Sequence, residues 1–190
     1  MRTSSLSKLS KQFIERWSPR AFLSDKISQE DLMTLFEAAR WSPSCFNAQP
    51  WFFVYASKTE DLMRFQSVLN DSNRVWASKA PVLVLLFARK NFTHNDKPNR
   101  WADFDSGAAW MALNLQAKQQ GLYCHGMGGF DQTKAYEVAG VDAEKFNVLC
   151  AIAIGKLGAA ALLPNDLQEK EKPSPRNVLE KIVSEGKFLS

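Results

Sequence analysis

The stretch Pro81-Val82-Leu83-Val84-Leu85-Leu86-Phe87 contains six consecutive apolar residues after a proline. Proline is tolerated at the first position of a strand, and an unbroken apolar run indicates a strand buried on both of its faces. Residues 148–154 form a second run of this kind, which ends at Gly155. The two runs predict the centre of a buried sheet.

Further strands and helices alternate on either side of these runs. Ser28 and Asp31 resemble a helix-capping box, and Gly121 and Gly140 are natural helix ends. Strands are expected at residues 51–56 and, followed by a glycine-rich turn, at 122–130. One helix is expected after Ser28, and a second is expected to begin after Thr59, which would be its N-cap. Further helices are expected at residues 105–120, 133–139 and 178–183. Loops are expected at residues 41–50, 89–101 and 164–176.

This alternation predicts an α+β fold of the α/β three-layer type, with a central mixed sheet flanked by helices. The 190 residues fit a single domain, 1–190, and the shares of hydrophobic (45%) and charged (23%) residues are ordinary for a globular protein. Residues 1–12 are polar and do not resemble a signal peptide, and no stretch approaches the ~20 apolar residues of a membrane span. We therefore expect a cytoplasmic protein.

The net charge of +4 suits anionic partners, among them nucleic acid, membrane surfaces and phosphorylated cofactors. No run of about five like charges concentrates it, so a nucleic-acid or membrane patch is not indicated. A solvated basic surface is the favoured explanation of the charge. The three cysteines are widely spaced and predict neither a disulfide frame nor a zinc site.

Several familiar motifs are absent, including the phosphate loop, the dinucleotide fingerprint and the H-E-x-x-H zinc motif. Cys124 and His125 are adjacent and could form a nucleophile–base pair. Neighbouring residues of a strand point to opposite faces, however, which favours a buried structural cysteine.

Four polar segments could bind a ligand. Arg16 and Arg20, with Ser18 between them, would converge on an anion if the segment turned as a helix start; two solvated arginines are the alternative. Residues 39–51 form a polar loop between a helix and a strand. The glycines of residues 126–131 would let a flat ligand approach backbone N–H groups, or would simply form a tight turn. Residues 172–176 place Lys172 and Arg176 on a proline-rich tail.

In this order and at these separations, the segments resemble the FMN-dependent nitroreductase family from about residue 16 to residue 183. The most specific match is Pro43-Ser44-x-x-Asn47-x-Gln49-Pro50-Trp51. It is supported by Arg16-x-Ser18-x-Arg20-x-Phe22, Ala80-Pro81, Asp105-x-Gly107-Ala108-Ala109, Gly121-Leu122 and Gly128-Gly129-Phe130-Asp131.

The resemblance implies a role for each segment. The first segment and Arg176 would hold the phosphate, the ribityl chain and the pyrimidine edge of FMN. The loop around Asn47 would reach the flavin of a partner subunit, and the two glycines would present N–H groups near the flavin N5 and O4 atoms. Asn70 and Asn73 would meet the pyrimidine edge. The implied cofactor-binding set is Arg16, Trp17, Ser18, Arg20, Pro43, Ser44, Cys45, Asn47, Asn70, Asn73, Gly128, Gly129 and Arg176.

Cys45 departs from the family pattern, in which another small polar residue is common, and Ser174 stands where a second basic residue is common. Lys172 is the candidate to replace that charge. Residues 89–101 are too short for the helical excursion that covers the pocket in larger relatives, so substrate selectivity does not transfer.

The implied activity is a ping-pong cycle. NADH or NADPH gives hydride to FMN, and a nitroaromatic, quinone or enone acceptor then takes it. The flavin supplies the hydride chemistry, so no catalytic side chain and no metal is expected, in keeping with the two histidines. The alternatives are a narrower family reaction, such as dehalogenation or flavin breakdown, and a flavin-binding protein without turnover. The expected assembly is a homodimer with flavin sites at its interface.

Overall fold

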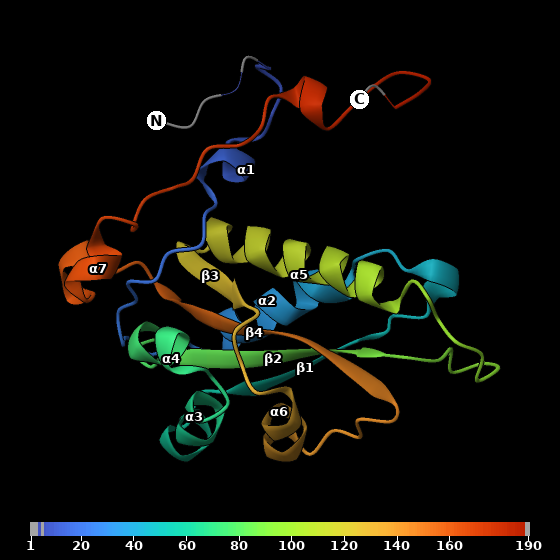
Figure 1. Cartoon of the computed structure of the whole chain (residues 1–190), viewed down its shortest axis with the longest axis horizontal. Helices are drawn as coiled ribbons and strands as arrows, with labels where there is room; N and C mark the ends of the chain where they lie inside the picture. The colour runs from blue at the N-terminus through green and yellow to red at the C-terminus, as the bar shows by residue number, and fades with distance from the viewer. Residues whose placement is uncertain (1–3, 5, 189–190) are drawn as a thin grey trace.

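A computed structural model describes residue 4 and residues 6–188 of the chain. The described residues do not include 1–3, 5, 189 and 190. The predicted domain 1–190 and the predicted polar start 1–12 therefore lie partly outside the described residues. Figure 1 shows a layered body with a sheet at its centre and both chain ends extending from the same side.

The sheet has four strands in the order β1-β2-β4-β3. They are β1 (Trp51–Ala56), β2 (Val82–Arg89), β3 (Leu122–Met127) and β4 (Phe146–Lys156). The α+β class with helices around a central sheet is confirmed. Every pairing among the described strands is antiparallel, however, so the parallel pairs of a mixed sheet are not found there. The reason is the position of β4: β2 and β3 run in the same direction, and β4 lies between them.

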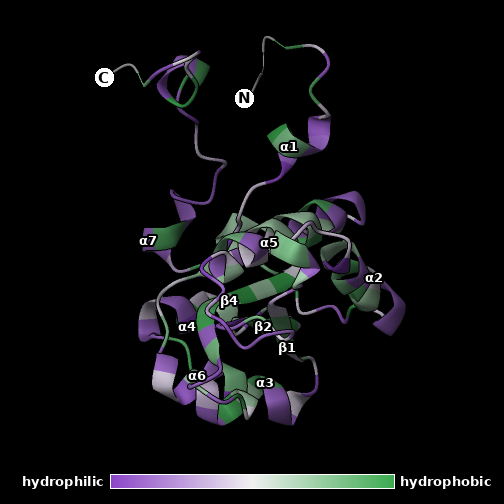
Figure 2. Cartoon of the chain, turned by 90° about the vertical axis from the view of Figure 1, so that its right-hand side faces the viewer, coloured by the Kyte–Doolittle hydropathy of each residue, from purple (hydrophilic) through white to green (hydrophobic). Residues whose placement is uncertain are grey.

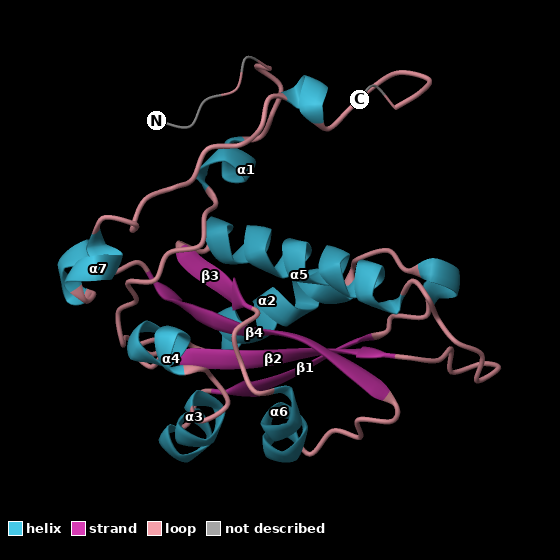
Figure 3. Ribbon diagram, viewed as in Figure 1, coloured by secondary structure: helices cyan, strands magenta, loops and turns pink. Residues whose placement is uncertain are grey.

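Helices cover both faces of the sheet, as Figures 1 and 3 show. One face packs against α2 (Gln29–Arg40) and α5 (Ala102–Gln119), and the other against α3 (Thr59–Gln66), α4 (Asp71–Ala77) and α6 (Gln132–Ala139).

Strand β2 belongs to both cores. Val82, Val84 and Leu86 lie in the cluster with α2 and α5, whereas Leu83, Leu85 and Phe87 lie in the opposite cluster. Successive side chains of a strand point to opposite faces, and here both faces are covered, which explains the unbroken apolar run. The hydropathy colours of Figure 2 show the same arrangement, with apolar strands between helices whose outer faces are largely polar.

Short-range signals in the sequence set most helix ends. The Ser28 hydroxyl accepts a hydrogen bond from the Asp31 amide at 3.0 Å, which confirms the predicted cap of α2. Gly121 and Gly140 follow their helices with φ of 72° and 65°, a region that glycine enters without a Cβ clash. The prediction of Thr59 as a cap was wrong by one residue: Lys58 takes that position without a side-chain hydrogen bond, and Thr59 begins the helix.

The two ends of the chain extend away from the body (Figure 1). They contain α1 (Lys11–Glu15), α7 (Asn165–Gln168) and a single 3-10 turn, η3 (Leu179–Lys181), in place of the helix expected at 178–183. Two other 3-10 turns are η1 (Cys45–Asn47) and η2 (Ala160–Leu162). In the described part of the chain, no helix has both the length and the apolar character needed to cross a membrane.

Candidate functional site

A cationic pocket of about 210 Å³ lies where the N-terminal segment meets the C-terminal tail. Its lining consists of Arg16, Trp17, Ser18, Arg20, His125, Lys170, Lys172, Ser174 and Arg176. Five of these nine residues are Lys or Arg. Guanidinium and ammonium groups that converge in this way favour a phosphate-sized anion.

The N-terminal wall of the pocket is not helical, so the helix start that was the condition for Arg16 and Arg20 to converge does not form, although both arginines line the pocket. Helix α1 ends at Glu15, and Arg16 already has extended backbone angles (φ −65°, ψ 126°). Long-range pairing takes the place of the helix: the Gly158 amide donates to the Ala21 carbonyl at 2.8 Å, and Phe22 forms a bridge with Leu157. The backbone that directly follows Arg20 is therefore held by the residues that follow β4.

His125 lines the pocket from strand β3. Its Nδ1 lies 2.8 Å from the Pro19 carbonyl oxygen, which can only accept, so Nδ1 bears the proton and donates it. The ring also lies 4.6 Å from that of Trp76, centroid to centroid. Burial lowers the pKa of His125, and the nearby Arg20 and Arg16 charges lower it further.

Cys124 points the other way, into the core beneath α2 and α5. It is fully buried, and burial raises the pKa of its thiol far above the usual range, so the thiol stays protonated. The predicted opposition of Cys124 and His125 is confirmed, and the geometry does not form a nucleophile–base pair.

A tight turn after β3 forms the second part of the candidate site. The Gly129 carbonyl accepts from the Asn73 side chain at 2.9 Å and from the Asn70 amide at 3.2 Å. Asn70 also caps α4 through its side-chain oxygen, which accepts from the Asn73 amide at 3.0 Å. The two asparagines therefore hold the turn that contains Gly128 and Gly129. Because Gly128 comes three residues after His125, this turn lies within ~10 Å of the pocket along extended backbone.

The loop that contains Pro43 and η1 forms the third part. The Cys45 amide donates to the buried Asp105 carboxylate at 2.9 Å, and the Ser44 hydroxyl accepts from the Gln49 amide at 2.9 Å. Phe46, Asn47 and Gln49 have φ of 52°, 53° and 45°. Positive φ in three non-glycine residues of one loop is costly and persists only where surrounding contacts enforce it.

This loop lies far from the pocket of the same chain. Asp105, which holds the loop, is in the first turn of α5, whereas the pocket's N-terminal segment meets the other end of α5 through the Lys118–Glu15 ion pair at 3.5 Å. Lys118 follows Asp105 by thirteen positions along the helix, a distance of about 20 Å at the α-helical rise. Figure 1 shows the loop and α1 at opposite ends of α5.

Of the residues predicted from the sequence, five share the pocket and four lie near Gly129, but four lie at the far end of α5. The first group is Arg16, Trp17, Ser18, Arg20 and Arg176. The second is Asn70, Asn73, Gly128 and Gly129. The third is Pro43, Ser44, Cys45 and Asn47.

Sequence reasoning missed Lys170, Glu171 and His125. The Lys170-Glu171-Lys172 triplet adjoins the proline-rich tail and was the available signal for the first two. Nothing near His125 in the sequence links it to the N-terminal segment, since its contact with Pro19 spans 106 residues.

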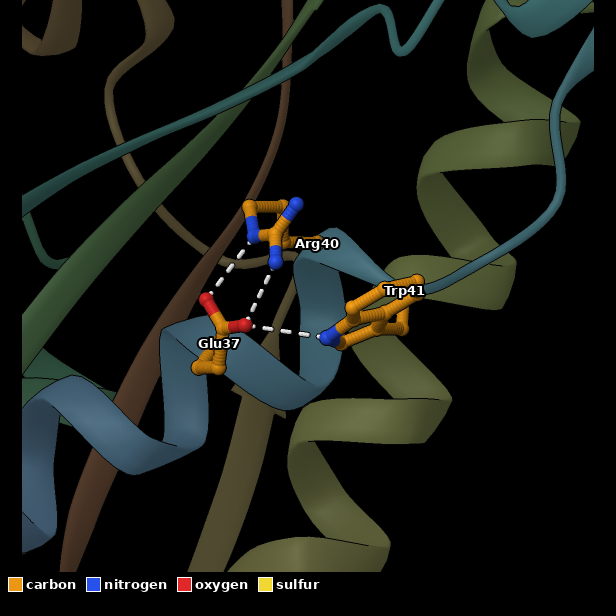
Figure 4. A network of polar contacts seen from close by, with 3 residues as sticks. All are labelled: Glu37, Arg40 and Trp41. Atoms are coloured by element: carbon orange, nitrogen blue, oxygen red, sulfur yellow. Dashed lines mark hydrogen bonds and ion pairs between the residues drawn. The ribbon is translucent and has the colours of Figure 1, made fainter.

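A larger but open depression of about 460 Å³ lies on the outer face of α2. At its edge Glu37 accepts hydrogen bonds from Arg40 at 2.6 and 2.8 Å and from the Trp41 indole at 2.9 Å (Figure 4). These contacts, first with Arg40 and then with Trp41, lower the pKa of Glu37 to about 2. The Glu37 and Arg40 side chains are solvent-exposed, so this network contributes little to stability. The described ranges contain no cluster of His, Cys, Asp or Glu suited to a metal ion.

The fold and the pocket thus define an α+β protein with helices on both faces of an antiparallel sheet and a cationic pocket beside strand β3. The chain belongs to the nitroreductase family, whose family model matches residues 14–75 and 65–156. This confirms the resemblance and the oxidoreductase class predicted from the sequence.

Solved structures and curated relatives agree with this assignment. A crystal structure of an oxidoreductase containing FMN is 38% identical, covers 99% of this chain and 96% of its own, and has a TM-score of 0.93. A protein of Ralstonia nicotianae named as an NADH dehydrogenase/NAD(P)H nitroreductase is 26% identical, over 78% of this chain and 86% of its own. An oxygen-insensitive NADPH nitroreductase of Helicobacter acinonychis is 28% identical, over 68% of this chain and 77% of its own.

Proposed function

We propose that the protein is an FMN-dependent oxidoreductase that takes hydride from NADH or NADPH and passes it to an electron-poor acceptor of the nitroaromatic, quinone or enone type. The observation that supports it is the pocket with five Lys and Arg residues contributed by both ends of the chain. The similar oxidoreductase contains FMN, and the curated relatives are named for NAD(P)H and nitro reduction.

The donor set fits the phosphate end of FMN. Arginine forks and a hydroxyl match a phosphate dianion, and Arg16 already donates to the Ser18 hydroxyl at 3.4 Å. The pocket volume of about 210 Å³ is below the ~300–1,000 Å³ of sites that enclose a whole ligand. The pocket therefore accommodates the phosphate and ribityl portion, and the ring needs a further surface.

Each wall of the site has a separate task in this proposal. Arg16, Ser18 and Arg176 hold the phosphate, and Arg20 places a cation where negative charge develops on the ring edge. The turn at Gly128 and Gly129 offers backbone N–H groups to the ring. Bound FMN supplies the hydride-accepting and hydride-donating atom. Burial lowers the pKa of His125, and its Nδ1–H donates to the Pro19 carbonyl, so the proposal assigns this residue to positioning Pro19 and gives it no acid or base role.

The missing surface for the ring is assigned to a second copy of the chain. The loop of Pro43, Ser44, Cys45 and Asn47 is about 20 Å from the pocket of its own chain along α5 and cannot complete that pocket. The C-terminal arm also exposes apolar side chains, among them Ile182 at 69% and Val183 at 63%. A twofold dimer would cover such an arm and bring one chain's loop to the other's pocket.

The test of function begins with the cofactor. Release and chromatography should yield FMN, because the chain lacks the fingerprint that binds the adenosine half of FAD. Anaerobic NADH or NADPH should then bleach the bound flavin, and an acceptor panel should restore its colour. Bound FMN that neither reductant bleaches would make this a flavin-binding protein without turnover. Product formation without an added acceptor would point to dehalogenation or flavin breakdown instead.

The test of the dimer uses sedimentation at micromolar protein and a pair of inactive variants. Arg16→Ala removes a phosphate contact, and Asn47→Asp alters the loop. Co-refolded mixtures should regain one intact site of two if each site uses both chains. An active, flavin-loaded monomer would contradict shared sites. That residues 1–190 form a single domain and that the protein is cytoplasmic stay predictions.

A further inference from the structure

Glu171 is an acidic residue at the rim of a pocket built for an anion. It lies between Lys170 and Lys172, both of which line that pocket. Among the described residues, however, its carboxylate forms no ion pair. It accepts instead from the backbone of the N-terminal segment: from the Ala21 amide at 2.8 Å and from the Arg20 amide at 2.8 and 3.1 Å.

These contacts join the two walls of the pocket. Arg20 and Ala21 donate successive backbone N–H groups, a pattern that binds anionic oxygens well, and a charged acceptor strengthens such bonds. Ala21 is 1% exposed, so its N–H would be costly to leave unpaired. The contact spans 151 residues and lies immediately before Lys172, Ser174 and Arg176 in the chain.

We propose that Glu171 is a positioning residue for the anion pocket: it fastens the C-terminal tail to the Arg20–Ala21 backbone and thereby holds the tail's cations opposite Arg16 and Arg20. The proposal rests on the proposed FMN function for the identity of the anion. The geometric claim, that Glu171 joins the two walls, stands on the hydrogen bonds alone.

Two physical effects of removing Glu171 have opposite signs. Deleting a negative charge near the pocket would strengthen the binding of a phosphate dianion by Coulomb attraction. Releasing the tail would weaken it, because Lys172 and Arg176 would no longer be held in place. A positioning role therefore predicts that removing Glu171 lowers the affinity for the phosphate dianion. Electrostatics alone predicts that the affinity rises.

The experiment compares the affinities of the refolded apoprotein for FMN and for riboflavin, which lacks the phosphate. Glu171→Ala should weaken FMN binding about tenfold, the scale of one lost charged hydrogen bond, and should change riboflavin binding little. Glu171→Gln keeps an oxygen that can accept from both amides, as Oε1 does now, and should restore most of the FMN affinity. Glu169→Ala removes an exposed charge from the same tail and serves as the matched control.

Hydrogen exchange at Arg20 and Ala21 provides a second readout that needs no flavin. Both amides should exchange faster in Glu171→Ala than in Glu169→Ala. The proposal is overturned if Glu171→Ala binds FMN as tightly as the wild type or more tightly, if FMN and riboflavin affinities fall equally, or if the exchange is unchanged. A wild-type protein that binds no FMN would refute the proposed function, while the exchange measurement would still decide whether Glu171 holds the tail.

Discussion

Asn73 donates a side-chain hydrogen bond of 2.9 Å to the carbonyl oxygen of Gly129. The packing is so close that a Cβ on Gly129 would lie 2.8 Å from the side-chain nitrogen of Asn73 and 2.3 Å from the side-chain nitrogen of Asn70. Contacts this short do not occur for real Cβ atoms. A side chain at position 129 would therefore force the Asn70 and Asn73 side chains to move.

Gly129→Ala should lower the free energy of unfolding by ~1–3 kcal/mol, the usual cost of overpacking, because both asparagines must move. Gly128→Ala is the matched control, since a Cβ there meets no atom within 4 Å. Urea unfolding of both variants measures the difference. Equal stability of the two variants would show that Asn70 and Asn73 shift without cost.

Arg176→Ala should weaken FMN binding by about tenfold to a hundredfold, the range for a hydrogen bond to a charged group. Arg176 lines the pocket, whereas Lys181 is an exposed cation farther along the same arm. Lys181→Ala therefore controls for the loss of one positive charge. Quenching of FMN fluorescence on titration gives both affinities, and full FMN affinity in the Arg176 variant would mean that this arginine is merely a surface residue.

Protonation of His125 should destabilise the protein. Its folded-state pKa is lowered by burial and then by Arg20 and Arg16, so the unfolded chain binds a proton more readily than the folded one. The stabilisation is complete above the unfolded pKa of about 6.5 and is lost as the pH falls below it.

His125→Asn removes this titration and retains an N–H donor for the Pro19 carbonyl. The melting temperature of the apoprotein should fall more steeply from pH 7 to pH 5 in the wild type than in the variant. Parallel melting curves across this range would assign the acid sensitivity to other groups. A phosphate dianion in the pocket should offset the two arginine charges and raise the His125 pKa, which NMR titration with and without FMN can measure.

Asp105→Ala should destabilise the loop before β1, because the Cys45 amide loses its carboxylate acceptor. A fully buried donor left unpaired costs ~1–3 kcal/mol. Because Cys45 is only partly buried, the loss should fall at or below the lower end of that range, and Asp105→Asn, which keeps a side-chain oxygen, should lose less. Asp103→Ala, at an exposed position of the same helical turn, is the control. Urea unfolding and proteolysis within residues 41–50 measure the effect. Equal resistance to proteolysis of this loop in Asp105→Ala and in Asp103→Ala would contradict the prediction.

Local chemistry explains what could be predicted for the fold. The apolar run of β2 requires cover on both faces, Ser28 caps the helix that follows it, and Gly121 and Gly140 end helices. These signals act over a few residues, so they can be predicted from the sequence. The direction of neighbouring strands is not a local property, which is why the mixed sheet was expected and antiparallel pairing was found.

The residue types of the candidate site could also be predicted from the sequence. Which of these residues share one pocket could not. Arg16, Arg20 and Arg176 meet because Glu171 and the edge of the sheet hold the two chain ends together, not because residues 16–20 form a helix.

The sequence alone therefore indicated the four strands, the helix ends at Gly121 and Gly140 and the arginines of the pocket, since each depends on short-range pattern. The order of motifs along the chain indicated the family. Tertiary structure decided that His125 lines the pocket, that Glu171 binds the backbone of its N-terminal wall and that the loop at Cys45 lies at the opposite end of α5. Those placements depend on contacts between residues 60 to 151 positions apart, which only the packed chain brings together.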